Sequence, residues 1–263
     1  MPEPSDSIAA DPITVFDSGI GGISVLRHLL TLLPHENYIY LGDSANAPYG
    51  EKSAARVKEL TFRRVEELLH KGAKAVVLAC NTATSAAAAD LRAAYPRTVI
   101  VGIEPALKPA AACRPGSTVL VMATPMTLRE EKFRLLRQKW SGEARVIDLP
   151  CYGLAEMIDR GRTDGPELYA YLERLFREVP RQQVSAVVLG CTHYPHVRQA
   201  IASFFGPEVR IFDGGEGTAR ETCRRLREAG LLNPAPSAGR VEILNTAGPE
   251  MVRISWQLLG EHK

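Results

Sequence analysis

The 263-residue sequence predicts an α/β protein built from two pseudo-symmetric domains, each a mainly parallel sheet flanked by helices. Three observations support this fold class. Short apolar runs rich in β-branched residues alternate with longer amphipathic segments, which is the pattern of parallel sheets covered by helices. One strand-plus-cysteine segment occurs twice along the chain. The length suits two domains, or one large α/β domain, better than one small domain or three.

The predicted strands are short apolar runs, and most of them are apolar on both faces. In chain order they are Ile13–Asp17, Asn37–Gly42, Ala75–Ala79, Thr98–Gly102, Thr118–Ala123, Ala144–Asp148, Val184–Gly190, Val209–Asp213 and Val241–Asn245. Such strands are typical of parallel sheets that are buried on both sides. Ligands bind to these sheets beyond the carboxyl ends of the strands, so the residues that follow each strand are the candidate functional residues.

The segments between the strands carry helical patterns. Within Ser53–Lys71 the apolar residues recur at helical spacing, at Val57, Leu60, Val65, Leu68 and Leu69. The glycine-rich segment 213–217 is predicted to be a loop, and a helix is expected from about Thr218 to Ala229. A terminal helix is predicted from about Pro249, after the last strand.

One segment of the sequence reappears at a distance. Ala75–Thr82 resembles Ala186–His193, and in both copies a predicted strand ends at a cysteine, Cys80 or Cys191. Each copy has a strand at a comparable distance upstream and a helical stretch and a further strand downstream. A chance match between valine- and alanine-rich strands is the alternative, but the shared surroundings favour a duplicated α/β half. If the halves face each other about a pseudo-twofold axis, the two thiols would meet across one cleft.

The duplication also suggests the domain organisation. The first domain is predicted to comprise residues 13–97 and 208–263, and the second to comprise residues 98–207. Residues 1–12 contain no lysine or arginine and no long apolar run, so a disordered leader is expected rather than a signal peptide.

Composition excludes several classes of partner. The net charge is +2, from 32 basic and 30 acidic residues, which gives no electrostatic case for a nucleic-acid or membrane partner. The short basic run at residues 224–227 is interpreted as the solvated face of a helix. No segment contains the roughly 18 uncharged apolar residues that a membrane span requires. A cytoplasmic protein is therefore expected.

The cysteines are the first candidates for chemistry. They are odd in number and never occur as a CxxC pair: Cys80, Cys113, Cys151, Cys191 and Cys223. This pattern argues against a disulfide framework and against the common structural zinc sites. In a reducing compartment such residues are either small buried hydrophobic side chains or reactive thiols.

Cys80 and Cys191 stand out because each is predicted to lie where a strand ends and a helix begins. A helix start can lower a cysteine pKa from about 8.5 to about 3.5–7.5. Space-filling is the alternative for either cysteine taken alone, but their equivalent positions favour a function. Short polar residues follow both, namely Asn81, Thr82, Thr84, Thr192 and His193. These residues either cap helices or contact a ligand, and His193 can also tune Cys191 or act as a general acid beside it.

Two further strand ends carry polar residues. Asp17 begins the segment Asp17–Gly22, which is a poor phosphate loop because a carboxylate repels phosphate. An aspartate at this position is better suited to accept from an ammonium group or to take a proton. The segment Asp43–Gly50 is irregular, and its Pro-Tyr-Gly sequence suggests a tight turn that presents backbone N–H groups.

Taken together, the strand-end motifs resemble those of a known family. They are FDSGIGG (16–22), GDSANAPYG (42–50), ACNTAT (79–84), ATPMT (123–127) and LGCTHYP (189–195). In this order and spacing they resemble glutamate racemases of the aspartate/glutamate racemase superfamily, from about Ile13 to the C-terminus. The resemblance implies two α/β domains with the active site in the cleft between them. It also implies cofactor-independent interconversion of L- and D-glutamate, with no metal, and supply of D-glutamate for peptidoglycan. A homodimer is compatible with it.

The resemblance also assigns roles to residues. Cys80 and Cys191 match the two catalytic thiols, and Asp17 and His193 match their polar partners. Substrate contacts are implied for Asp17-Ser18, Tyr49-Gly50, Asn81-Thr82 and Thr192-His193, and for Thr124 and Thr127. Asp159 stands where the family commonly has a supporting glutamate. Other departures are Glu130 and Phe133, in place of serine and tyrosine, and the loop 45–47 before Pro48.

Two thiols suit racemisation, because one base would usually return the α-proton to the face it left, whereas a thiolate and a thiol on opposite faces invert the centre.

Three alternatives to a glutamate racemase remain open. An aspartate racemase is the nearest. A metal-binding or redox protein using Cys80, Cys191 and His193 is the second. The third is a nucleotide-binding module, which lacks a glycine fingerprint here.

Overall fold

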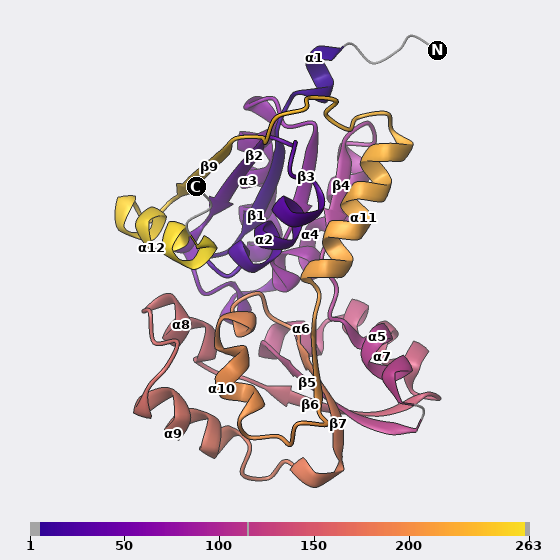
Figure 1. Cartoon of the computed structure of the whole chain (residues 1–263), viewed down its shortest axis with the longest axis vertical. Coiled ribbons are helices and arrows are strands. Elements are labelled where there is room, and N and C mark those ends of the chain that lie inside the picture. The colour runs from indigo at the N-terminus through magenta and orange to yellow at the C-terminus, as the bar shows by residue number, and fades with distance from the viewer. Residues whose placement is uncertain (1–5, 115, 261–263) are drawn as a thin grey trace. The chain divides into compact units, whose positions relative to one another are not determined.

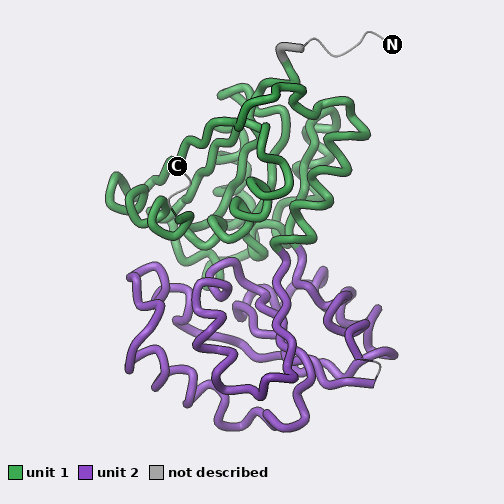
Figure 2. The backbone as a smooth tube through the Cα atoms, in the orientation of Figure 1, with its two compact units in different colours: residues 1–103, 215–263 green, residues 104–214 purple. Residues whose placement is uncertain are grey.

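The structure is a computed structural model that describes residues 6–114 and 116–260. The chain divides into two compact units (Figure 2). Unit 1 comprises residues 1–103 and 215–263, and unit 2 comprises residues 104–214. The chain therefore leaves the first unit once, builds the second, and returns.

Unit 1 contains a five-stranded sheet in the order β4-β3-β1-β2-β9, in which all neighbours are parallel. The strands are β1 (Ile13–Asp17), β2 (Tyr38–Gly42), β3 (Ala75–Leu78), β4 (Val99–Gly102) and β9 (Val241–Asn245). Every residue of the three central strands is buried, which explains why their sequences are apolar rather than alternating.

Helices cover both faces of this sheet (Figure 1). The helices of unit 1 are α1 (Asp6–Ala9), α2 (Ile23–Leu32), α3 (Ala54–His70), α4 (Asn81–Ala94), α11 (Gly215–Glu228) and α12 (Pro249–Leu259), with short 3₁₀ helices at Ser44–Asn46 and Tyr49–Glu51, and α1 lies beyond one end of the sheet. The apolar faces of α2, α11 and α12 share one core with alternate residues of the strands. The buried residues of α3 and α4 lie outside that core, and these two helices pack against each other on the opposite face.

Unit 2 contains a four-stranded parallel sheet in the order β6-β5-β7-β8. Its strands are β5 (Ser117–Ala123), β6 (Ala144–Pro150), β7 (Val184–Leu189) and β8 (Arg210–Asp213). Its helices are α5 (Leu107–Cys113), α6 (Pro125–Arg129), α7 (Glu131–Trp140), α8 (Leu154–Asp159), α9 (Pro166–Leu175) and α10 (Arg198–Ala202), with 3₁₀ helices at Arg181–Gln183 and Tyr194–Val197. Helices α8, α9 and α10 contribute to one core, and α5 and α7 to another.

The predicted fold class is confirmed. The order β4-β3-β1-β2 in unit 1 is repeated as β8-β7-β5-β6 in unit 2, which is the arrangement expected of a duplicated half. In both units the strand that precedes the cysteine motif pairs with the first strand of that unit. The carboxyl ends of corresponding strands therefore carry corresponding residues.

The predicted domain boundaries need correction at both crossings. Strand β4 pairs with β3 and stays in the first sheet, although a boundary at residue 98 assigned it to the second domain. Strand β8 pairs with β7 and belongs to the second sheet, although a boundary at residue 208 assigned it to the first. In each unit the last strand of the repeated half continues its own sheet, so the chain crosses after that strand.

Two smaller expectations also change. Helix α11 begins at Gly215, so part of the predicted loop 213–217 is the first turn of this helix. Of the predicted disordered leader, residues 1–5 lie outside the described residues, and Asp6–Ala9 form helix α1. The carbonyl of Ala9 accepts a hydrogen bond from the buried Lys74 ammonium group, which fastens the end of this helix to unit 1. Within the described ranges, none of the helices reaches the length and hydrophobicity that a membrane crossing demands.

Candidate active site

In unit 1, polar residues gather at the carboxyl ends of three adjacent strands. Asp17 is the last residue of β1, Asp43 follows β2, and Cys80 follows β3 after one residue. Strand β1 pairs with both β2 and β3, so these ends lie at one edge of the sheet. This is the edge at which parallel α/β sheets bind their ligands.

Cys80 is the N-cap residue of α4, as the sequence predicts. Its Sγ accepts from the backbone N–H of Ala83 at 3.4 Å, and it lies 3.4 Å from the Oγ of Ser18. The side chain is buried, with 6% of the residue exposed. The N–H groups and dipole of a 14-residue helix favour the thiolate over the thiol at this position.

Asp17 is fully buried, and its Oδ1 accepts from the backbone N–H of Gly19 at 2.9 Å. Three glycines follow within the segment Asp17–Gly22. Gly22 has a structural reason, because a Cβ there would lie 2.7 Å from the Asp17 Cβ and 3.0 Å from the Ala79 Cβ. A glycine at this N-cap lets α2 start directly against the strand ends.

Asn81 and Thr82 open α4 beside Cys80, and both are buried. Within the described part of the chain, the Oδ1 atom of Asn81 is a buried acceptor that has no hydrogen-bond partner. Buried polar atoms are nearly always paired, and exceptions often mark a place where a ligand binds. Asn81 is therefore suited to receive a donor from a bound molecule.

Tyr49 is almost completely buried, and its hydroxyl donates to Oδ2 of Asp43 at 2.8 Å. Burial, reinforced by the neighbouring Asp43 carboxylate, raises the pKa of this phenol. The hydroxyl therefore stays protonated, and its proton is donated to Asp43. The part of the predicted Tyr49-Gly50 contact that remains for a ligand is the main chain.

In unit 2, Cys191 follows β7 but does not begin an α-helix. Its carbonyl accepts from the N–H of Tyr194 at 3.1 Å, and the chain continues through the 3₁₀ helix Tyr194–Val197. The expected long helix start is therefore absent from this position. Cys191 is 8% exposed, and its Sγ lies 3.6 Å from Nδ1 of His193.

His193 is buried between Cys191 and a carboxylate. Its Nε2 lies 3.0 Å from Oδ1 of Asp159, the last residue of α8. Burial alone lowers the pKa of the imidazole, but Asp159, through its charge and hydrogen bond, and Cys191 raise it well above its ordinary value. The protonated ring donates from both nitrogens, one toward each partner. Asp159 thus reaches His193 even though its side chain is shorter than the usual glutamate.

The other predicted contacts in unit 2 are also buried or capping residues. Thr124 is the N-cap residue of α6, where its Oγ1 accepts from the N–H of Thr127 at 3.3 Å and lies 2.9 Å from the Thr127 hydroxyl. Thr192 is buried, with 4% exposed. Capping accounts for the threonine pair on its own, so a substrate role for Thr124 and Thr127 stays a prediction.

Comparison with known proteins assigns the chain to a family. The sequence profile described as Asp/Glu/Hydantoin racemase matches residues 21–222. The chain belongs to this racemase family. A glutamate racemase from Clostridium novyi (strain NT) is 47% identical over 251 residues, which cover 95% of this chain and 97% of that relative. The chain is thus an amino-acid racemase, an isomerase.

Solved racemase structures share its fold. The crystal structure of glutamate racemase from Thermus thermophilus in complex with beta-chloro-D-alanine has a TM-score of 0.78 and 35% identity, covering 96% of this chain and 94% of that one. The crystal structure of glutamate racemase from Francisella tularensis subsp. tularensis SCHU S4 in complex with D-glutamate has a TM-score of 0.83 and 28% identity. The match covers 95% of this chain and 94% of that one.

The remaining cysteines of the racemase have ordinary structural surroundings. Cys151 is buried after β6, its Sγ lies 3.4 Å from the carbonyl of Leu149, and burial raises the pKa of its thiol. Cys223 lies on the buried face of α11 and packs in the core of unit 1, and Cys113 lies at the end of α5. None of these three lies at the N-cap position that Cys80 occupies or beside a histidine, as Cys191 does.

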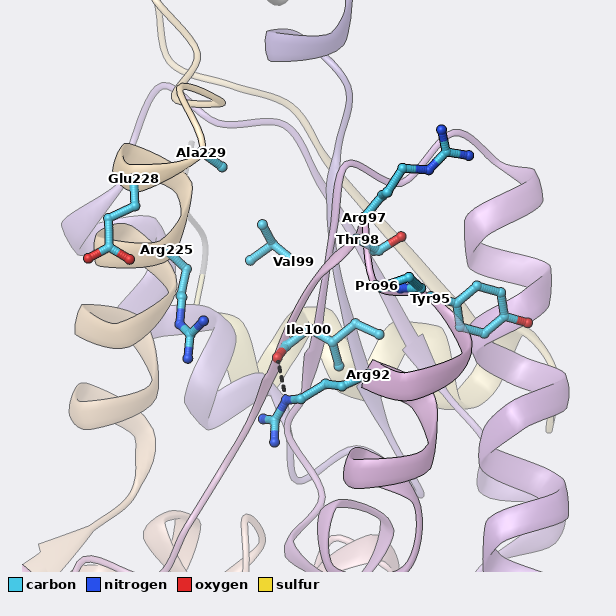
Figure 3. Close-up of a pocket in the computed structure, with 10 residues that line it drawn as sticks. All are labelled: Arg92, Tyr95, Pro96, Arg97, Thr98, Val99, Ile100, Arg225, Glu228 and Ala229. Carbon is cyan, nitrogen blue, oxygen red and sulfur yellow. Dashed lines mark hydrogen bonds between the residues drawn. The ribbon is translucent and has the colours of Figure 1, made fainter.

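The racemase also has a pocket of about 440 Å³ in unit 1, away from the cysteine motif (Figure 3). It is formed by the end of α4, residues 95–98, the start of β4 and the end of α11. Arg92 lines it and donates from Nε to the carbonyl of Ile100 at 3.0 Å. Since α4 runs from Cys80 to this pocket, about 21 Å of helix separates the two. None of the predicted catalytic or substrate-binding residues lines it.

Proposed function

We propose that this racemase interconverts L-glutamate and D-glutamate by a two-base proton transfer between Cα and the thiols of Cys80 and Cys191, without a cofactor. The observation that carries the proposal is the repeated strand order, with one cysteine at the equivalent strand end of each unit. Cys80 caps the 14-residue helix α4, whereas Cys191 lies 3.6 Å from Nδ1 of His193. In the proposed mechanism the two thiols act on opposite faces of Cα.

The proton balance of the reaction is simple. One thiolate takes the α-proton, and the Cα–H electron pair stays on carbon as a carbanion. The other thiol gives its proton to the opposite face of Cα, so it ends as a thiolate. The two thiols have then exchanged protonation states, which solvent exchange restores. The reverse direction uses the same groups in exchanged roles.

The surroundings of Cys80 support a role as a base. The start of α4 stabilises negative charge on its sulfur, which accepts from the backbone N–H of Ala83, and in the thiol form the sulfur donates to the Ser18 Oγ. The unpartnered Oδ1 of Asn81 is suited to accept from the substrate ammonium group. Asp17, at the adjacent strand end, is the proposed polar partner on this side.

The surroundings of Cys191 support the same role by different means. Nδ1 of His193 lies 3.6 Å from its sulfur, within reach for a proton to pass between them, and Asp159 outweighs the lowering effect of burial and raises the pKa of that imidazole. Carbanion formation without a cofactor needs such preorganised charges, together with exclusion of water around the substrate.

Glutamate is proposed as the substrate because glutamate racemases are the relatives that match almost the whole chain. The test uses purified, dialysed protein and follows the optical signal of L-glutamate, D-glutamate and L-aspartate in separate assays. Racemisation of both glutamate enantiomers, with aspartate turned over much more slowly, is expected. Preferred turnover of aspartate would contradict the substrate assignment. We further propose that the D-glutamate supplies cytoplasmic peptidoglycan synthesis, since that is the use the family resemblance implies.

The charge of Asp159 is expected to set the pH dependence of the reaction. Because the pKa of His193 is raised in the folded protein, its imidazolium persists at neutral pH and is lost only as the pH rises through that raised value. In the variant Asp159→Asn the pKa falls, so the imidazolium is lost at lower pH. We expect kcat to fall about 10- to 100-fold near neutral pH, which is the rate change that corresponds to the loss of one hydrogen bond to a charged group. In acid, where the imidazole of the variant is still protonated, kcat should fall less.

The measurement is the pH profile of kcat for Asp159→Asn against the native protein. Glu156→Gln is the matched control, because it neutralises another carboxylate on α8 that does not pair with His193. The control is expected to keep the native profile. An unchanged profile in Asp159→Asn would remove Asp159 from the proposed mechanism.

A further inference from the structure

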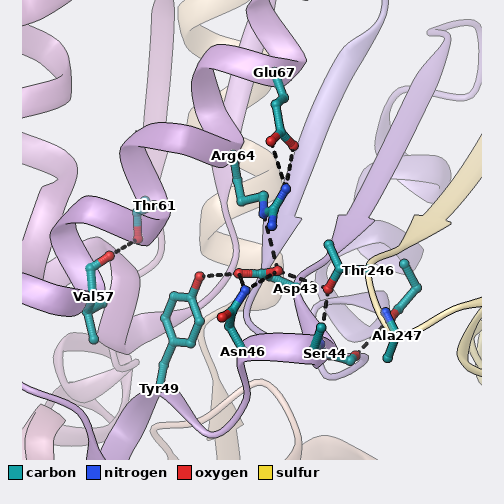
Figure 4. A network of polar contacts seen from close by, with 12 residues as sticks. Asp43, Ser44, Asn46, Tyr49, Val57, Thr61, Arg64, Glu67, Thr246 and Ala247 are labelled. Carbon is teal, nitrogen blue, oxygen red and sulfur yellow. Dashed lines mark hydrogen bonds and ion pairs between the residues drawn. The ribbon is translucent and has the colours of Figure 1, made fainter.

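Asp43 is a buried carboxylate at the candidate site to which neither the sequence motifs nor the family resemblance assigned a role. It is fully buried, and four side chains donate hydrogen bonds to it (Figure 4). The donors are Asn46 Nδ2 at 3.1 and 3.0 Å from its two oxygens, Tyr49 Oη at 2.8 Å, Arg64 Nε at 3.2 Å and Thr246 Oγ1 at 2.9 Å.

These contacts occupy the carboxylate completely. An ionised carboxylate offers about four lone-pair directions, and Asp43 already accepts from four donor atoms without any exposure to solvent. Arg64 supplies the compensating positive charge, and its other end pairs with Glu67 at 2.7 Å. Burial of a carboxylate without such a cation and such donors would cost folding free energy. Asp43 therefore has no oxygen left for proton transfer to a substrate.

The network fastens the loop between β2 and α3 to two other segments. Thr246, which follows β9, also accepts from the N–H of Ala45 at 3.0 Å and donates its own N–H to the carbonyl of Gly42 at 3.0 Å. The neighbouring Asn245 donates from Nδ2 to the Ser44 Oγ at 2.8 Å. Asp43 is the point at which the loop, helix α3 and the end of β9 are joined.

We propose that Asp43 is a positioning residue that holds Tyr49 and Gly50 so that their main chain meets the carboxylate of the amino-acid substrate. The inference rests on the proposed function. The buried Tyr49 hydroxyl donates to Asp43 rather than to a ligand, so this hydrogen bond fixes the position of the tyrosine within the loop. A backbone N–H pair can bind a carboxylate well only if the turn that presents it is fixed beforehand.

The test compares KM and kcat of Asp43→Asn with those of the native protein, in both reaction directions. The amide keeps the size of the side chain but loses the charge and half of the acceptors. We expect KM for both L- and D-glutamate to rise about 10-fold or more, the loss for one misplaced hydrogen bond to a charged group, with kcat changed less than about 3-fold. Tyr49→Phe is expected to raise both KM values in the same sense but less.

The matched control is Glu67→Gln, which makes the same carboxyl-to-amide change at the exposed end of the same arginine. It is expected to keep native KM and kcat values. If Asp43→Asn folds poorly by thermal unfolding, Thr246→Val replaces it, because it removes one donor to Asp43 and the acceptor of Ala45. It should raise both KM values as well.

A fall in kcat at unchanged KM would overturn the proposal, since it would assign Asp43 to the proton transfer. KM values equal to those of Glu67→Gln would overturn it too. Failure of the proposed function is a separate result, because it is measured on the native protein. If native protein racemises aspartate and not glutamate, the substrate assignment fails, and the same KM comparison is made with aspartate.

Discussion

Replacement of either Cys80 or Cys191 by alanine is expected to abolish racemisation and to leave the fold intact. In each turnover one thiolate is proposed to act as the base and the other thiol as the acid, with the roles exchanged in the reverse direction, and a positioned acid or base contributes about 10²–10⁴-fold to a rate. Loss of one thiol removes one face of the proton transfer in both directions. We therefore expect kcat/KM to fall at least about 10³-fold for L- and for D-glutamate, measured by the optical assay.

The matched control for these variants is Cys223→Ala. Cys223 is 8% exposed, as Cys191 is, but it lies on the buried face of α11 and packs in the core of unit 1. Its replacement is expected to cost some stability and to leave kcat within a few-fold of the native value. Full activity of Cys191→Ala would contradict the two-thiol account, and so would an equal loss in Cys223→Ala.

Replacement of Lys74 by methionine is expected to destabilise unit 1 severely. The ammonium group of Lys74 is completely buried, where it donates to the Glu36 carboxylate and to the carbonyl of Ala9. The other oxygen of Glu36 accepts from the N–H of Asn233 at 2.9 Å. Removing one partner leaves a buried, uncompensated charge, so the free energy of unfolding should fall by about 3–5 kcal/mol in urea denaturation.

The double variant Lys74→Met/Glu36→Gln is expected to recover much of this loss, because it removes both charges and keeps an acceptor for Asn233. Lys58→Met is the matched control. Its ammonium group pairs with Asp90 at 2.8 Å, but both side chains are about half exposed, so the expected cost is about 0–1 kcal/mol. Equal losses in Lys74→Met and Lys58→Met would show that burial of the first pair has no energetic consequence.

The strands could be predicted from the sequence because they are short apolar runs, and the three central strands of unit 1 are also buried throughout. All the predicted strands are present, and candidate site residues of unit 1 lie at the carboxyl ends of β1 and β3. The repeated segment ending in Cys80 and Cys191 also predicted the repeated strand order. These features depend on local hydrophobicity and on residues adjacent in the chain.

Features that depend on tertiary pairing could not be predicted in the same way. Nothing in the sequences of β4 and β8 says which sheet each strand joins, and their hydrogen-bonded neighbours decide to which unit each belongs. Arg64 and Thr246 carry no sequence signal for Asp43, since they lie 21 and 203 residues away from it. The reach of Asp159 to His193 depends on where α8 ends relative to β7, which spacing along the chain does not define.

The central claim is that two thiols serve opposite faces of Cα, and deuterium labelling tests it most directly. Native protein is incubated with L-glutamate in D₂O, and both enantiomers are recovered at low conversion for mass analysis. Because the thiol that delivers the proton has exchanged with solvent, the account predicts one deuterium at Cα of the D-glutamate product and almost none in the remaining L-glutamate. Deuterium entering the recovered L-glutamate as fast as the product, or a product that retains its α-proton, would contradict the two-base account.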